Sequence, residues 1–362
     1  MTSTARAIER DPAASTAKTL RVQPKLDFEL IKASRCSTQT LQEITEFLDT
    51  QETSHPFQWP RWSYGEEIFA LLRCEGRIRW LAQCDLIYPA SRLLKPIKAL
   101  IVNRGPVCDD LEMVAIGLQT LAAEACKRKI AYIDIMPEWT GAFAGIAAET
   151  LARNRWQALS ESKSSLRLCL KPSAEDLLAS FRKTTRYEIR RATSQGIEVF
   201  IARKEGEYRD FLQLYSAMAR QRKFAAERAD LLTRVFHWLE SEPGRGGLFL
   251  AREAGIIRGG ALVLRFGGRS WYILGATSKD GSVGVGHLLQ WKAIRWAKEN
   301  GCVEYDFGGY REGATSGPAL FKRGFCGQVA HFISSRRYIV NPGRYRALEA
   351  IGRVRRGLGV KS

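Results

Sequence analysis

The first stretch of the sequence that could support chemistry combines a carboxylate, a pair of glycines and a lysine. Within residues 304–325, Asp306 lies near the end of an expected strand, Gly308 and Gly309 follow it, and Lys322 comes after a loop rich in Gly, Ser and Thr. A glycine pair lets the backbone approach a ligand closely. A carboxylate can orient or accept a proton, and a lysine can stabilise developing negative charge. The competing interpretation is a strand, a surface loop and a lysine whose stem covers apolar surface.

A second candidate is a group of cations within residues 173–195, which we expect to form one continuous helix. Arg182, Arg186 and Arg190 recur every four residues, so they share one face, and Tyr187 lies in the adjacent row. The planar guanidinium group of arginine suits phosphate. The spacing therefore indicates a phosphate-binding face, and the alternative is a basic surface that is simply solvated.

Two charged residues flank a Gly-Pro turn that follows the expected strand 99–102. Arg104 precedes the turn and Asp109 comes after it, so the two side chains are expected near each other. An ordinary surface turn with an ion pair would explain the same pattern.

A glycine-rich loop at residues 281–286 comes directly before an expected helix at 287–300. Backbone N–H groups at the start of a helix can hold a pyrophosphate, so Gly284 and Gly286 are candidates for binding coenzyme A. A flexible loop without a ligand is the alternative.

The composition favours a globular protein with an anionic partner. The chain has 362 residues, 45% of them hydrophobic, and a formal net charge of +18. Such an excess of cations favours nucleic acid, a phosphorylated substrate or an anionic membrane face. No apolar run approaches the roughly 20 residues that cross a bilayer, and residues 1–25 lack the apolar core of a signal peptide. We expect a cytoplasmic protein, either free or in peripheral contact with the inner membrane face.

The eight cysteines and four histidines are scattered along the chain. They show none of the spacings of a zinc site, so we expect no metal. Scattered cysteines in a chain of this length suggest reduced, mostly buried thiols in a cytosol.

The order of the expected elements indicates two units of similar style. We expect a disordered polar lead at 1–25, a first α/β unit at 26–150, a second at 151–340 and a basic tail at 341–362. In the second unit, two helices, an antiparallel meander, a glycine loop, a helix and a strand follow one another, as in acyltransferase domains of the GNAT type. In that fold the glycine loop normally begins with Arg or Gln, whereas this chain has Gly281 there.

Four motifs in order give the chain a family resemblance. RGPVCD, YIDIMPE, FRKTTRYEIRRATSQGIEV and YDFGGY with GPALFKRGF resemble the Fem family of aminoacyltransferases, which build peptidoglycan interpeptide bridges. The resemblance covers about residues 57–338. It implies two GNAT-like subdomains that share a cleft, an aminoacyl-tRNA donor and a phosphorylated peptidoglycan precursor as acceptor. No heptad-rich insertion is present, so we expect no coiled-coil arm.

The resemblance also implies roles for the candidate residues. Lys322 would lie beside the acceptor phosphate or the developing oxyanion, and Arg186 and Arg190 would hold phosphate. Asp109 and Asp306 would orient the amine or take its proton. The remaining substrate-binding candidates are Arg104, Tyr187, Tyr305, Gly308, Gly309 and Tyr310.

Two other functions stay open from the sequence. The glycine loop also resembles that of relatives that use acetyl- or acyl-CoA, which would act on a small amine or a cell-envelope saccharide. The net charge alone would fit a nucleic-acid-binding protein. In the first interpretation the reaction needs no cofactor besides its acyl donor.

Overall fold

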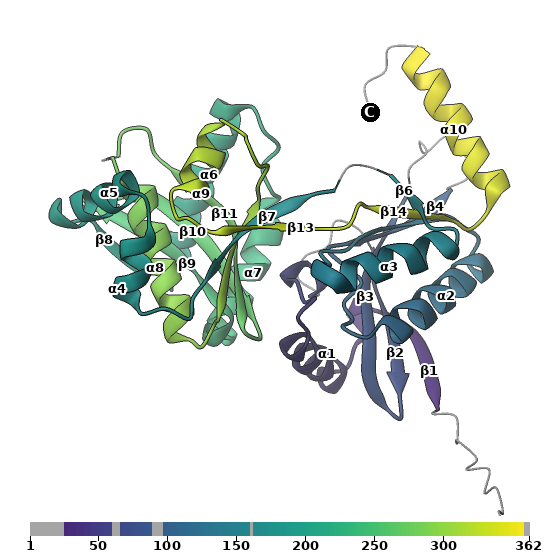
Figure 1. Ribbon diagram of the computed structural model, residues 1–362. Helices are drawn as coiled ribbons and strands as arrows, with labels where there is room; N and C mark the ends of the chain where they lie inside the picture. The colour runs from purple at the N-terminus through teal and green to yellow at the C-terminus, as the bar shows by residue number, and fades with distance from the viewer. Residues whose placement is uncertain (1–24, 60–65, 89–96, 160–161, 282, 358–362) are drawn as a thin grey trace, which may run out of the picture.

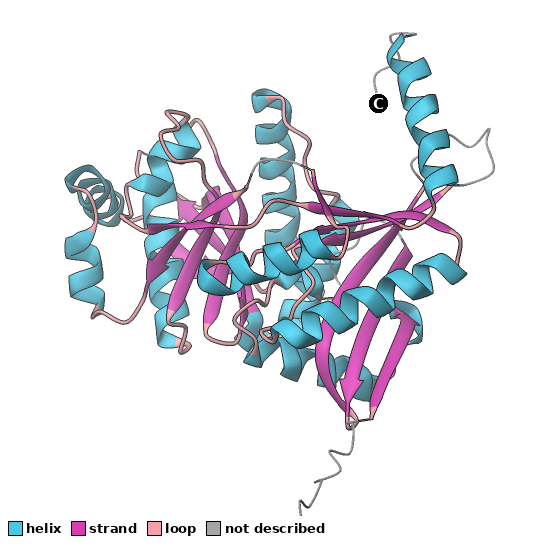
Figure 2. Ribbon diagram, turned by 45° about the vertical axis from the view of Figure 1, so that its right-hand side comes forward, coloured by secondary structure: helices cyan, strands magenta, loops and turns pink. Residues whose placement is uncertain are grey.

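The computed structural model describes residues 25–59, 66–88, 97–159, 162–281 and 283–357. Its strands form two seven-stranded mixed sheets, each covered by helices (Figures 1 and 2). The mixed α/β fold expected from the sequence is therefore confirmed. The polar lead expected at 1–25 lies outside the described residues except for its last position. Among the described residues the longest helix has 18 residues, and no helical hairpin projects as an arm.

The first sheet has the strand order β1-β2-β3-β4-β5-β14-β6. Strands β1 to β4 form an antiparallel meander, whereas β4 and β5 run parallel and are joined by helix α2. A parallel pair needs such a crossover, because a tight hairpin cannot join parallel strands. The elements are β1 (Leu26–Lys32), β2 (Glu66–Cys74), β3 (Arg77–Ile87), β4 (Lys98–Asn103), β5 (Ile130–Met136), β6 (Gln157–Ala158), β14 (Arg336–Ile339), α1 (Thr38–Thr50), α2 (Leu111–Lys127), α3 (Gly141–Arg153), α10 (Pro342–Gly357) and the 3-10 turns Ala33–Arg35 and Pro56–Gln58.

The second sheet has the order β13-β7-β12-β11-β10-β9-β8. Its parallel pair, β11 and β12, is joined by α8, and the two strands pair only over Arg269–Trp271 and Glu304–Asp306. The elements are β7 (Ser164–Cys169), β8 (Glu198–Ile201), β9 (Gly246–Glu253), β10 (Ile256–Phe266), β11 (Arg269–Thr277), β12 (Glu304–Gly309), β13 (Gln328–His331), α4 (Ala174–Ser180), α5 (Lys183–Ser194), α6 (Glu205–Arg222), α7 (Ala229–Ser241), α8 (Val285–Glu299), α9 (Gly317–Arg323) and the 3-10 turn Pro243–Arg245.

Alternating side chains of the central strands serve two different cores. In β2, Ala70 and Leu72 pack with α2 and α3, whereas Phe69 and Leu71 point to the other face. This alternation follows from the two-residue period of a strand. The second face of β2 packs in one cluster with α1 and with α6 and α7 of the other half. One hydrophobic core therefore joins the two halves.

The chain does not divide at one point as the sequence suggested. The expected boundary at residue 150 falls inside α3, and β14 leaves the second half to pair with β5 in the first sheet. α10 then packs on that sheet, whereas the sequence indicates a separate basic tail at 341–362. The pairing of β14 depends on residues about two hundred positions away, and local patterns do not reveal it.

Two helices differ from the sequence-based expectation. Residues 173–195 form α4 and α5 rather than one helix, because Phe181 and Arg182 are extended and the Arg182 amide donates to the Gly324 carbonyl oxygen at 2.9 Å. The segment around Lys322, for which the sequence indicated only the end of a loop, is the short helix α9 with Pro318 in its first turn. Proline is well suited to that position.

Candidate active site

A cavity of about 740 Å³ borders β10 and β11 and extends to the start of α8 and to α9. Its wall combines apolar side chains with a few polar groups, as is typical of small-molecule sites. The residues that line it include Arg222, Tyr272, Gly284, Gly286, His287, Phe321 and Lys322. Two predicted features, the glycine loop and Lys322, therefore meet at one cavity.

Lys322 reaches this cavity from α9. Its Nζ donates a hydrogen bond to the Gly309 carbonyl oxygen at 2.7 Å. The pKa of Lys322 is lowered to about 8, mainly because the group is buried; the Asp306 carboxylate opposes this shift, and the charge of Arg104 adds to it. Below pH 8 the site therefore holds a partly desolvated ammonium ion.

The glycine pair shapes the backbone around that lysine. Gly308 has a φ of +71°, which favours glycine, and its amide donates to the Asp306 carboxylate at 2.7 Å. This turn presents the Gly309 carbonyl to Lys322. The two glycines therefore contact side chains of the site itself, namely Asp306 and Lys322.

Asp306 is a buried ion-pair partner. Its side chain is 1% exposed, and it accepts hydrogen bonds from Arg167 Nε at 2.9 Å and from the Ser165 hydroxyl at 3.0 Å. Together with the Gly308 amide, these donors satisfy the carboxylate. Asp306 therefore holds Arg167 and the Gly308 turn in place.

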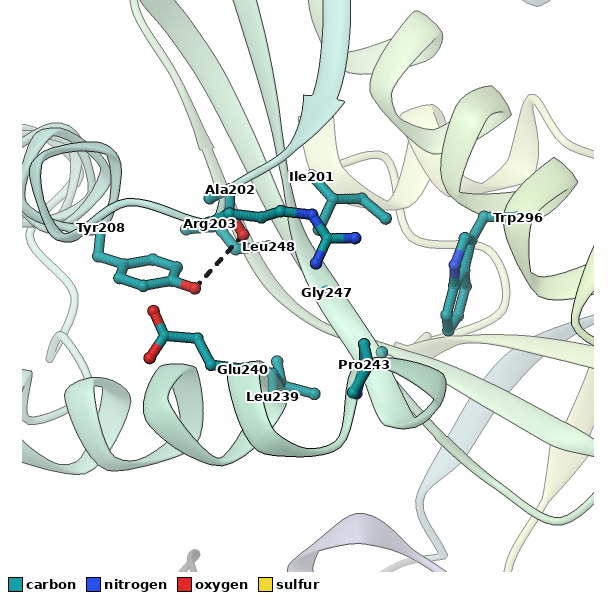
Figure 3. Close-up of a pocket in the computed structure, with 11 residues that line it drawn as sticks. Ile201, Ala202, Arg203, Tyr208, Leu239, Glu240, Pro243, Gly247, Leu248 and Trp296 are labelled. Atoms are coloured by element: carbon teal, nitrogen blue, oxygen red, sulfur yellow. Dashed lines mark hydrogen bonds between the residues drawn. The ribbon is translucent and has the colours of Figure 1, made fainter.

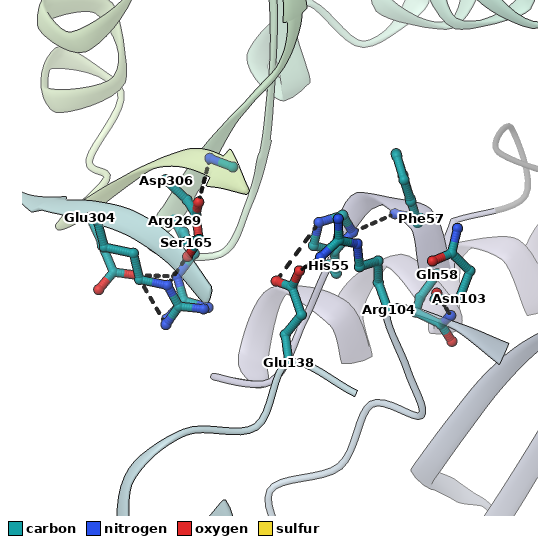
Figure 4. A network of polar contacts seen from close by, with 12 residues as sticks. His55, Phe57, Gln58, Asn103, Arg104, Glu138, Ser165, Arg269, Glu304 and Asp306 are labelled. Carbon is teal, nitrogen blue, oxygen red and sulfur yellow. Dashed lines mark hydrogen bonds and ion pairs between the residues drawn. The ribbon is translucent and has the colours of Figure 1, made fainter. Parts of the chain in front are cut away.

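Charged side chains from both halves of the molecule face each other next to Asp306 (Figure 4). From the first half, Glu138 is bonded to Arg104, and His55 Nε2 lies 3.9 Å from Glu138. From the second half, Arg269 binds Glu304 and also donates to the Glu52 carbonyl oxygen at 3.0 Å. Arg269 thus links the two halves directly.

Burial also changes the protonation of this network. It raises the pKa of Glu138. The charge of Arg104 opposes this rise, and the charge of Asp306 adds to it. Burial lowers the pKa of His55 well below its usual value, and the charges of Arg104 and Arg269 act in the same direction. His55 is accordingly neutral near pH 7, and Arg104 is the counter-charge of Glu138.

Four residues of this network are missing from the candidates given by the sequence, namely His55, Glu138, Arg167 and Arg269. Arg167 carried a usable signal, because it is the only charge in the apolar strand SSLRLC. In the sheet it lies opposite Asp306. The other three sit at turns or strand starts, where charged residues are common.

Asp109 has a different position from the one expected of a catalytic group. Its two carboxylate oxygens accept hydrogen bonds from the Glu52 amide at 2.5 Å and the Thr53 amide at 2.9 Å. It borders a separate cavity together with Arg79 and Leu111. The structure thus does not bring Asp109 and Lys322 to the same cavity, and Asp109 holds the segment after α1.

Tyr305 and Tyr310 belong to the core of the second half, which corrects the expectation that they line an acceptor peptide. Tyr305 is fully buried, and its hydroxyl donates to Gln290 Oε1 at 2.7 Å. Tyr310 is 9% exposed and packs in the same cluster. Tyr305 alternates with Asp306 along β12, and the sequence did not reveal that both faces of this strand are covered.

The basic residues of α5 divide into two roles. Arg186 donates to the carbonyl oxygens of Ala179, at 2.9 Å, and Phe181, and so caps the end of α4. Arg190 is exposed, and Tyr187 is 60% exposed. Arg190 and Tyr187 remain available to a ligand, whereas Arg186 is largely engaged by the fold. None of the three lines the cavity next to Lys322.

The glycine loop forms the start of α8 at the cavity wall. Gly284 has a φ of +99°, and a Cβ there would lie 2.5 Å from the Glu188 carbonyl oxygen. Glycine is therefore required by both conformation and space. Gly286 lies in the first turn of α8, and a Cβ there would meet only ordinary contacts at 3.6 Å or more.

A second cavity, of about 330 Å³, lies between α7 and the start of β9 (Figure 3). Arg203, Glu240 and Trp296 line it, and the Tyr208 hydroxyl donates to the Ala202 carbonyl oxygen at 3.3 Å. No residue selected from the sequence lines this cavity.

The described residues contain neither a metal-binding cluster nor a membrane-spanning helix. They hold no group of three or more His, Cys, Asp or Glu side chains placed to bind a metal ion. Nor does any described helix combine the length and apolarity that a membrane crossing demands.

Known proteins match part of this sequence and most of this fold. The acetyltransferase (GNAT) domain family matches residues 179–323. A UDP-N-acetylmuramoylpentapeptide-lysine N(6)-alanyltransferase of Weissella viridescens is 22% identical over 144 residues, 40% of this chain and 42% of that protein. A lipid II:glycine glycyltransferase of Staphylococcus haemolyticus is 27% identical over 128 residues, 34% of this chain and 30% of that protein. These matches span less than half of each relative.

The fold comparison covers more of the molecule. The crystal structure of FemX superposes with a TM-score of 0.75 over 89% of this chain and 100% of that chain, at 18% identity. The resemblance to Fem-type proteins is thus confirmed in sequence and in fold, and the expected GNAT-like architecture with it.

Proposed function

We propose that this chain, a GNAT-fold relative of the Fem-type aminoacyltransferases, transfers an aminoacyl group from a charged tRNA to an amine of a peptidoglycan precursor. The names of two relatives support the acceptor class, since one describes alanyl transfer to a muramoylpentapeptide lysine and the other glycyl transfer to lipid II. The excess of cations in the chain fits a polyanionic donor and a phosphorylated acceptor.

The observation that carries the proposal is the placement of Lys322. Its partly desolvated ammonium lies at a cavity of about 740 Å³ and donates a hydrogen bond to the Gly309 carbonyl oxygen. The charge of Asp306 raises the pKa of this ammonium. A fixed cation in such a site can stabilise an oxyanion far better than water does. An activated ester needs little other assistance, because positioning of the amine supplies much of the rate.

The reaction balances without a further cofactor. The neutral acceptor amine attacks the ester carbonyl carbon, and the Lys322 ammonium stabilises the oxyanion that forms. The carbon–oxygen ester bond then breaks, the ribose oxygen leaves and gains a proton, and the amine nitrogen loses one. Asp306 and Arg167 keep Lys322 and the glycine turn in place during these steps.

The exposed part of α5 is the proposed site for the acceptor phosphate. Arg190 and Tyr187 are exposed there, and arginine can bind phosphate through two parallel hydrogen bonds. Arg186 supports this face indirectly, since it caps α4.

A second candidate function is N-acyl transfer from acyl-CoA. It is favoured by Gly284 and Gly286, which line the same cavity at the start of α8, where backbone amides can bind a pyrophosphate. The two functions differ in the donor and share the role of Lys322.

A donor competition experiment separates these functions. The purified chain is mixed with one isotopically labelled peptidoglycan precursor and with either charged tRNA or acyl-CoA, and the product is identified by mass spectrometry. We expect the precursor to gain an aminoacyl mass with charged tRNA only. Transfer from acyl-CoA alone would establish the second function, and transfer from neither would reject both.

A further inference from the structure

A cationic surface forms at the end of the first sheet, far in sequence from the cavity. β14 pairs with β5, so the chain after Ile339 begins α10 beside the start of β5 and the end of α2. The amides of Val340 and Asn341 both donate to the Ala131 carbonyl oxygen at 3.0 Å. Arg344 Nη1 donates to the Lys129 carbonyl oxygen at 3.0 Å. Two basic segments separated by more than two hundred positions are thereby joined.

The joined segments carry a clear excess of positive charge. We call this surface the basic corner, and it consists of Lys127, Arg128, Lys129, Arg344, Arg346 and Arg353. The carboxylates in the last turn of α2 and on α10 are Glu124, which pairs with Lys127, and Glu349. Arg128, Arg346 and Arg353 are exposed, and no ion pair is found for them among the described residues.

Two apolar side chains at the start of α10 are already packed, which bears on the kind of partner. Tyr345 and Leu348 pack on a small cluster of Ala99, Ala131 and Tyr132. Figure 1 shows the rest of α10 projecting from the body of the molecule. A helix that binds a lipid surface inserts its apolar face between head groups, and here Tyr345 and Leu348 contact the sheet instead. The described surface of α10 thus offers mainly charge to a partner.

We propose that the basic corner binds the phosphate backbone of a structured RNA, and specifically an arm of the tRNA that delivers the aminoacyl group. Backbone binding needs arginine and lysine side chains without base contacts, and this is what the surface provides. In Figure 1, α9, which carries Lys322, lies in the upper part of one half and α10 at the upper edge of the other, so an RNA that contacts both must be extended. The identity of the RNA rests on the proposed function, whereas the surface itself does not.

The first test measures binding of deacylated tRNA by fluorescence anisotropy at several salt concentrations. The triple variant Arg128→Gln, Arg346→Gln, Arg353→Gln is compared with Arg209→Gln, Arg234→Gln, Lys292→Gln, which removes the same charge from exposed sites on α6, α7 and α8. Each lost phosphate contact lowers the slope of log K against log salt by about 0.7–0.9. We expect a slope that is shallower by about 2 in the first variant and unchanged in the control.

The second test separates this inference from the proposed function. Transfer is measured with full-length charged tRNA and with an aminoacylated trinucleotide that is too short to reach the basic corner. We expect the triple variant to raise KM for the full-length donor at least tenfold and to leave the short donor unaffected. If transfer never occurs but RNA binding still depends on the basic corner, only the proposed function fails.

Three results would overturn the inference. One is equal loss of RNA binding in both triple variants, which would show that only net charge matters. Another is a basic-corner triple variant that binds RNA as the wild type does but no longer sediments with vesicles containing about one third phosphatidylglycerol. That result would make an anionic membrane the partner. A wild-type protein that binds neither tRNA nor these vesicles would also reject it.

Discussion

At the scale of single residues, the environment of Lys322 explains why a lysine suits this position. Its ammonium has one backbone acceptor, the Gly309 carbonyl, and Asp306 supplies charge at longer range because Arg167 already occupies that carboxylate. The ammonium can therefore turn toward a new negative charge without giving up a close ion pair. A permanent ion pair would have weakened that response.

Removing the charge of Lys322 should remove most of the activity and little of the stability. Lys322→Met keeps the side-chain stem, so we expect kcat to fall by about 10²–10³ while the melting temperature stays within a few degrees. Lys292→Met is the control, because Lys292 is exposed on α8. Steady-state kinetics and thermal unfolding measure both. Equal activity of the two variants would show that Lys322 adds only general basicity.

The lowered pKa of Lys322 predicts a specific pH dependence. Because that pKa is about 8, the ammonium is lost as the pH rises through 8, well before an ordinary lysine would titrate. In Lys322→Arg the charge persists at all these pH values. The ratio of wild-type to variant rate should be constant below pH 7 and fall above pH 8. A ratio that stays constant to pH 10 would contradict the role of this ammonium.

At the scale of elements, the start of α8 depends on a close approach to α5. Gly284 lies against the Glu188 carbonyl oxygen, and its positive φ directs the loop into the helix. The same loop lines the cavity. The geometry of this cavity wall is therefore set partly by a contact between two helices.

Gly284→Ala should disturb this arrangement, whereas Gly286→Ala should not. At Gly284 the methyl group would clash with backbone and impose a strained φ, so we expect the free energy of unfolding to fall by about 1–3 kcal/mol. Donor affinity should fall as well. Gly286 lies within α8 with space around it, and alanine there should leave the free energy of unfolding unchanged or raise it slightly. Denaturant unfolding and donor titration test both variants.

Comparison of expected and observed elements shows which signals a sequence contains. The glycine loop, the helix after it and strand β4 were predictable, because apolar periodicity and glycine positions act locally. The break between α4 and α5 was not, since it depends on the Gly324 carbonyl more than a hundred positions away. The candidate site was predictable at Lys322 and Asp306. Arg167 and Glu138 became part of it only through sheet register and through packing between the halves.

At the scale of the whole molecule, the two halves are held together by shared packing and by polar links. Trp59 packs against Trp238 and Phe266 at ring distances of 5.8 and 6.1 Å. Asp49 at the end of α1 accepts from the Gly267 amide at 2.7 Å. The charged network beside Lys322 thus lies in a junction that is tightly connected on one side.

The anchor of β14 should be among the costliest ion pairs to break. Arg337 binds both oxygens of Asp134, at 2.6 and 2.7 Å, and both side chains are largely buried. Arg337→Met leaves a buried carboxylate unpaired, so we expect a loss of about 3 kcal/mol in the free energy of unfolding. Arg295→Met breaks an exposed pair and should cost less than about 1 kcal/mol. Similar losses in both variants would mean that Arg337 contributes only as an ordinary surface charge.

The insertion of β14 between β5 and β6 has a consequence for synthesis on the ribosome. β5 ends at Met136 and β14 begins at Arg336, so β5 lacks its neighbour until the whole second half has been translated. At about 5–20 residues per second, that delay is roughly 10–40 s. Throughout it the nascent first half exposes an unpaired strand edge, which can pair with other chains. Chaperones that bind extended segments therefore have a defined target and a defined interval on this chain.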